Sequence, residues 1–148
     1  MIFSLLFHFL VSTAVLNTSG HSHSIMPLTE DVRVTRTFER VAGKNDYLVT
    51  VLIHASGIIG FGRLTEFFPP GVTASVVENG AASTNLANDR LKFIWVSLPD
   101  SPEIKVSYTI TFPDNKLIMH YRGEFRYLSG NAATSYKLEP KDLKLIGE

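Results

Sequence analysis

The sequence predicts an all-β protein, an immunoglobulin-like antiparallel β-sandwich of about seven or eight strands. Apolar and polar residues alternate with a period of two between residues 103 and 112, as in a strand that buries one face. Similar apolar segments recur at intervals of about 8–12 residues, with turn residues between them. No segment shows a sustained helical period. These observations favour two packed sheets around one core.

The composition sets the size and the class of the protein. The chain has 148 residues, of which 45% are hydrophobic and 19% are charged, as expected for one folded domain. Fourteen basic residues balance fourteen acidic ones, which gives no electrostatic reason to expect nucleic acid as a partner. The absence of cysteine excludes disulfides, thiol catalysis, zinc–thiolate sites and a lipoprotein anchor.

The first 29 residues contain no Asp, Glu, Lys or Arg. Residues 2–16 form an apolar run of signal-peptide length, shorter than the roughly 20 residues that a membrane-spanning helix needs. We therefore predict a signal peptide over residues 1–20, a polar linker over residues 21–29, and export to the periplasm or the cell surface. An uncleaved anchor and a hydrophobic element of the fold are the alternatives.

The sandwich domain is predicted to cover residues 30–138, and its first strand, residues 31–41, carries arginines on its apolar side. Arg36 and Arg40 share the parity of Phe38. Charged residues at inward positions are a feature of edge strands. We therefore place this strand at the edge of a sheet.

The other predicted strands differ in how much of their surface is apolar. Residues 47–55 and 91–98 are apolar on both faces and predict central strands. Pro99 and Pro102 then end the second of these strands and form a turn before the alternating strand 104–112. Further strands are predicted at residues 58–68, 72–77, 116–128 and 133–138, the loop 79–90 has room for another, and residues 139–148 are predicted to be a charged tail.

Several local motifs follow one another in an order that resembles a known group of proteins. They are GFGRLTEFFPPGV from Gly60, LKFIWVSLP from Leu91, EIKVSYTITF from Glu103 and GEFRYLSGN from Gly123. The series is similar to a sandwich domain of exported Bacteroidota proteins, and more distantly to repeat sandwiches of bacterial surface proteins and to cohesin-like modules. The resemblance covers about residues 32–136, although Phe68 stands where leucine is usual. It implies an envelope protein of a gliding or surface-secreting bacterium.

No motif in the sequence predicts catalysis or a cofactor. The chain has neither a G-x-S-x-G elbow nor a glycine-rich phosphate loop leading into a helix. His54 and His120 lie within predicted strands, each without a set of neighbouring ligands. Asp89, Asp100 and Asp114 lie near turns, without the dense oxygen pattern of a calcium loop. We therefore predict a non-enzymatic protein with no cofactor and no obligate small molecule.

Aromatic residues supply the candidate partner contacts. Trp95 shares the parity of Leu91 and Phe93, which favours a place in the core over a sugar-stacking platform. Phe67 and Phe68 are consecutive, so one of them is expected to point outward, where it would suit a partner contact. Packing of the pair beneath a loop is the alternative.

A weak metal hypothesis concerns the N-terminus. If the signal peptide is cut after Gly20, the new amine, two backbone amides and the His23 ring form a square-planar set that suits copper(II) or nickel(II), with His21 beside it. The alternative is a polar terminus with no specific metal affinity.

Two classes of function follow from this sequence. The first is a structural or protein-interaction module of the bacterial envelope, for example an accessory subunit of an outer-membrane, secretion or gliding complex. It would bind a protein partner and no nucleic acid, and would meet the membrane only through that partner or an uncleaved N-terminal segment. The alternative is a carbohydrate-binding module of an exported protein.

Overall fold

The computed structural model of the chain describes residues 31–41, 45–114, 120–140 and 143–146. Within these ranges the chain forms ten β-strands and no α-helix, so no described segment is a helix able to cross a membrane. The strands are β1 (Asp31–Arg40), β2 (Asp46–Ser56), β3 (Gly62–Phe67), β4 (Thr73–Glu78), β5 (Ser83–Ala87), β6 (Arg90–Trp95), β7 (Ile104–Thr111), β8 (Arg122–Ser129), β9 (Ala132–Leu138) and β10 (Leu143–Ile146).

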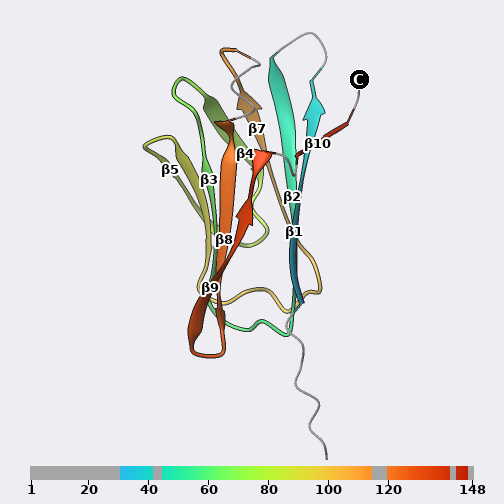
Figure 1. Cartoon of the computed structure of the whole chain (residues 1–148), viewed down its shortest axis with the longest axis vertical. Coiled ribbons are helices and arrows are strands. Elements are labelled where there is room, and N and C mark those ends of the chain that lie inside the picture. Colours follow the sequence, from blue (N-terminus) through green and yellow to red (C-terminus); the bar gives the residue numbers. More distant parts are fainter. Residues whose placement is uncertain (1–30, 42–44, 115–119, 141–142, 147–148) are drawn as a thin grey trace, which may run out of the picture.

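These strands form two five-stranded sheets that face each other (Figure 1). Sheet A has the strand order β10-β1-β2-β7-β4, and sheet B has the order β5-β6-β3-β8-β9. Neighbouring strands are antiparallel throughout, except that β1 and β10 run parallel. The predicted immunoglobulin-like β-sandwich is confirmed, with ten strands rather than seven or eight.

Two short strands account for the larger number. β5 lies in the segment 79–90, where the sequence has room for a strand. β10 lies within the segment 139–148, which we expected to be a charged tail, and it pairs with β1 at the edge of sheet A. The prediction that the first strand is an edge strand is therefore wrong, because β1 lies between β10 and β2.

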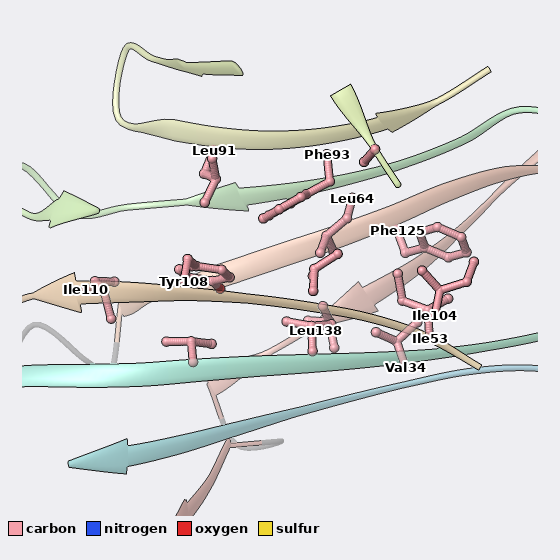
Figure 2. Close-up of a cluster of buried hydrophobic side chains, with 14 of the residues drawn as sticks. Val34, Ile53, Leu64, Leu91, Phe93, Ile104, Tyr108, Ile110, Phe125 and Leu138 are labelled. Atoms are coloured by element: carbon pink, nitrogen blue, oxygen red, sulfur yellow. The ribbon is translucent and has the colours of Figure 1, made fainter. Parts of the chain in front are cut away.

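The core fills the space between the sheets with the inward side chains of both (Figure 2). Val34 and Ile53 from sheet A face Leu64 and Phe125 from sheet B, and all four are at most 4% exposed. Trp95 is 2% exposed, so its predicted place in the core is confirmed. Three strands with apolar residues at their inward positions, β2, β6 and β7, supply half of the described buried hydrophobic residues of this core, and each pairs with neighbours on both sides.

Candidate functional site

A polar cluster lies buried in the middle of this apolar core. Arg36 of β1 donates a hydrogen bond from Nη1 to Oε2 of Glu66 on β3, over 2.7 Å, and both side chains are at most 1% exposed. The guanidinium also lies over the ring of Tyr121, 4.2 Å from its centroid. The hydroxyl of Tyr121 is hydrogen-bonded to that of Tyr108 on β7. The cluster thus ties sheet A to sheet B through charge as well as packing.

Burial and neighbouring charges shift the pKa values of all four groups in the cluster. Burial raises the pKa of the Glu66 carboxyl, while the positive charge of Arg36 opposes that shift. Burial lowers the pKa of Arg36, but its interactions with Glu66, Tyr121 and Tyr108 together outweigh that shift and leave the pKa above its usual value. Burial raises the pKa of both phenols, Tyr108 and Tyr121, well above their ordinary range. Because these groups are sealed from solvent, the cluster is suited to holding the sheets together rather than to acting on a substrate.

The accessible feature is the side of the sandwich where β4 and β5 end their sheets, here called the open edge. Among the described strands, β4 pairs with β7 and β5 pairs with β6, so each leaves one edge unpaired. A groove of about 350 Å³ lies between the two strands. Its lining residues are Phe68, Val72, Thr73, Ala74, Leu86, Ala87, Asn88 and Asp89.

Leu86 shows that the core is incompletely covered at the open edge. It pairs across the sheet with Leu91, so both side chains belong to the core-facing side of sheet B. Leu91 is fully buried, whereas Leu86 is 51% exposed. On the other strand of the open edge, β4, Val76 pairs with the buried Tyr108 and is itself 37% exposed. Core-facing apolar side chains that remain in water lose the free energy that burial would give them, about 25 cal/mol per Å².

The two strands of the open edge differ in how they are protected from pairing with another chain. β4 contains a register shift between Val76 and Glu78, and both a bulge and a charge discourage strand addition. β5 has neither, because its sequence STNLA is uncharged and pairs in continuous register with β6. β5 is therefore the edge that is better prepared to accept a further strand.

Trp95 holds the turn between β4 and β5 against the core. Its indole Nε1 donates a hydrogen bond to the carbonyl oxygen of Gly80, over 2.7 Å. Gly80 has a φ of +56°, and a Cβ at this position would lie 2.5 Å from the carbonyl oxygen of Lys105. The turn between β4 and β5, at one end of the open edge, is thus fixed in place, and the groove lies at the other end of this edge.

The comparisons with known proteins concern the architecture alone. No protein-family model matches the chain, and no curated protein matches it. Several solved structures share the sandwich arrangement at low sequence identity.

One match is an exo-β-N-acetylglucosaminidase of Vibrio harveyi, with 9% identity and a TM-score of 0.46 over 78% of this chain; the chain spans 18% of that enzyme. A second is the collagen-binding subdomain of the Enterococcus faecalis surface protein ACE, with 12% identity, a TM-score of 0.47 and coverage of 71% of this chain and 92% of that one. A third is a non-cellulosomal cohesin of Archaeoglobus fulgidus, with 15% identity, a TM-score of 0.35 and coverage of 76% and 86%.

The structure separates the two phenylalanines that the sequence singled out. Phe68 is 7% exposed and its ring stacks on that of Tyr121, so it is a core residue that also borders the groove. Phe67 is partly exposed on the outer side of β3, with the guanidinium carbon of Arg90 5.4 Å from its ring centroid. Phe67 is therefore the member of the pair that is placed to contact a partner.

The other predicted candidates are not brought together. His54 lies 3.2 Å from a carboxylate oxygen of Glu103, and His120 is exposed at the start of the segment leading to β8. Within the described residues no three potential metal-ligating side chains form a group, and Asp89, Asp100 and Asp114 are exposed on different loops. His21 and His23 lie outside the described residues.

Sequence reasoning missed both the buried cluster and the open edge. An arginine on the apolar face of a strand favours an edge strand, which is the basis on which the strand of Arg36 is predicted to lie at an edge. In the structure Glu66, on a distant strand, pairs with Arg36 and makes its burial possible. Leu86 gave no signal, because an isolated leucine in a loop of small residues shows no period.

Proposed function

We propose that this protein is a non-enzymatic interaction module of the bacterial envelope, which binds an extended segment of a protein partner at the open edge. The observation that carries the proposal is the half-exposed Leu86 on the core-facing side of an unpaired, uncharged edge strand. A partner strand added to β5 would gain main-chain hydrogen bonds, and an apolar side chain from it would enter the groove beside Leu86.

The predicted signal peptide and the resemblance to exported sandwich domains support a location in the periplasm or at the cell surface. A role as accessory subunit of an outer-membrane, secretion or gliding complex is in keeping with such a partner. The carbohydrate-binding alternative draws support from a different surface, which is described in the next subsection.

Site-specific photo-crosslinking in cells tests the proposal. A benzophenone amino acid replaces Thr84, which lies on β5 two residues before Leu86. We expect a discrete covalent adduct with one protein. The additional substitution Leu86→Lys should abolish the adduct, because it places a charge on the core-facing side of the edge.

Leu128→Lys is the matched control, since Leu128 is 38% exposed on β8, away from the open edge. This variant should leave the adduct unchanged. The proposal is overturned if no adduct forms, or if Leu128→Lys abolishes it as completely as Leu86→Lys does.

A further inference from the structure

The outer face of sheet B concentrates basic side chains. Positions that alternate with the buried ones point away from the core, and the strand register aligns them in rows across the sheet. Among the described strands, these positions hold one carboxylate, Glu124, and six basic residues, namely Arg63, Arg90, Lys92, Arg122, Arg126 and Lys137. Since the whole chain is neutral, this surplus arises from the fold and is invisible in the composition.

The outer face of sheet A carries the opposite excess. Between residues 33 and 111, its described outward positions, with Glu103 just before β7, hold two basic residues and four carboxylates: Arg33, Lys105, Glu39, Asp46, Glu78 and Glu103. One of these carboxylates, Glu78, is neutralised in part by Lys105 at 3.0 Å, and Glu103 lies 3.2 Å from Nε2 of His54. Charge is thus separated across the sandwich, and the outer face of sheet B presents a positive potential to any approaching molecule.

A pocket of about 350 Å³ lies within the basic face, where β3 and β9 end and β8 begins. This volume is near the lower end of the range of small-ligand sites, roughly 300–1,000 Å³. Its lining combines three kinds of group: the ring of Phe67, the cations of Arg122 and Lys137, and the carboxylates of Glu124 and Glu139. Gly123 supplies backbone between them.

We propose that the outer face of sheet B binds an acidic polysaccharide, with one uronate unit in this pocket. Arg122 and Lys137 are suited to the carboxylate of the sugar, because guanidinium and ammonium groups form the strong charge-assisted hydrogen bonds. Glu124, which also forms an ion pair with Arg126 at 2.9 Å, can accept hydrogen bonds from sugar hydroxyls, and Phe67 offers an aromatic face to the apolar side of the ring. The remaining cations, on β3, β6 and β8, lie where neighbouring units of the chain would pass.

The aromatic content of this face favours a uronate chain over nucleic acid. Single-stranded nucleic acid is usually held by several stacking aromatic side chains, and Phe67 is the one aromatic residue at the outward positions of the described strands of sheet B. An anionic membrane would be met better by apolar residues projecting beside the pocket. The outward row next to the pocket holds Asn85, Lys92, Thr65, Glu124 and Lys137, and the outward apolar residues Ile94 and Leu128 lie in rows farther from it.

Calorimetric titration with polygalacturonate tests the proposal, with methyl-esterified polygalacturonate as the matched neutral ligand. We expect the wild-type protein to bind the acid form, and the methyl ester to bind at least ~10-fold more weakly. Arg122→Gln combined with Lys137→Gln should lower the affinity at least ~10-fold, since each removes a charge-assisted hydrogen bond. Arg33→Gln, which removes a cation from the outer face of sheet A, should change the affinity less than ~2-fold.

A second variant and two competing ligands distinguish a built site from simple charge attraction. Phe67→Ala should weaken binding without altering the slope of log affinity against log salt concentration, whereas the Arg122/Lys137 variant should make that slope shallower. Urea unfolding of each variant checks that it is folded. The proposal is overturned if the acid and ester bind equally, if Arg33→Gln weakens binding as much as the double variant, or if single-stranded DNA or phosphatidylglycerol vesicles bind more tightly than polygalacturonate.

Discussion

The buried pair Arg36–Glu66 provides the sharpest test of how this fold is held together. Each charge is sealed in the core and its main compensation is the other, at 2.7 Å. Removing one partner leaves a bare charge in an apolar environment, which typically costs about 3–5 kcal/mol. A domain of this size is stable by about 5–15 kcal/mol. Arg36→Met and Glu66→Leu should therefore each bring the protein close to unfolding.

Removing both charges should reverse most of that loss. Arg36→Met combined with Glu66→Leu leaves no buried charge, and such replacements are often neutral or stabilising by about 1–4 kcal/mol. The contact between the guanidinium and the Tyr121 ring, at 4.2 Å, is lost as well, at a cost of up to about 2 kcal/mol. We expect the double variant to be at least about 1 kcal/mol more stable than either single variant.

Urea unfolding monitored by the fluorescence of Trp95, the single tryptophan, measures these differences. Arg33→Met is the control, because Arg33 is an exposed arginine on the same strand and its loss should change stability by no more than about 0.5 kcal/mol. A double variant as unstable as the weaker single variant would refute this account, as would single variants that lose less than about 1 kcal/mol.

Three further predictions concern the same core. The free energy of unfolding should fall as the pH rises above about 10, the pKa of tyrosine in unfolded chains, because unfolded tyrosines release protons that the folded ones retain. The loss is up to about 1.4 kcal/mol per pH unit for each buried phenol. Urea unfolding between pH 9 and 11 should show a flatter pH dependence for Tyr108→Phe combined with Tyr121→Phe, and an equally steep dependence would count against this prediction. Trp95→Phe should lower the free energy of unfolding by at least about 1 kcal/mol, through the lost hydrogen bond to Gly80 and the smaller ring. It should also increase amide hydrogen exchange in the turn between β4 and β5. Unchanged exchange there would contradict the view that Trp95 holds this turn against the core. Gly123→Ala should cost about 1–3 kcal/mol, because its Cβ would lie 2.5 Å from Oε2 of Glu66. The cost should shrink in the stable Arg36→Met, Glu66→Leu double variant, and an equal cost in both backgrounds would show that the carboxylate is not what the methyl group meets.

The features predicted correctly from the sequence are those with local signals. The alternation around Tyr108 and the proline-bearing turn at Pro99 and Pro102 are complete within about ten residues, so the strands β6 and β7 could be predicted without knowing their neighbours. The parity of Trp95 likewise placed it in the core, where it is found. Such patterns depend on which face of a single strand is buried, and one strand is enough to show this.

The features that were missed depend on strands meeting in space. Arg36 looks like an edge residue until Glu66, thirty positions away, is placed opposite it in the other sheet. The basic face was hidden for the same reason, since Arg90 and Arg122 come from different strands and flank Phe67 only through the sheet register, as Arg63 meets Arg126. A balanced charge count averages over such faces and cannot reveal them.

The parallel pairing of β1 and β10 has a mechanical consequence. Four residue pairs, from Arg36–Leu143 to Glu39–Ile146, join the first described strand to the last. β1 enters the sandwich at its lower end in Figure 1, and β10 leaves at the upper end. A pulling force between these two ends would slide one strand along the other, so the hydrogen bonds between them would be loaded in shear and would have to break together. An antiparallel pair pulled at adjacent ends would instead unzip one bond at a time. The fold is thus arranged to transmit tension along its long axis while its two sheets remain packed.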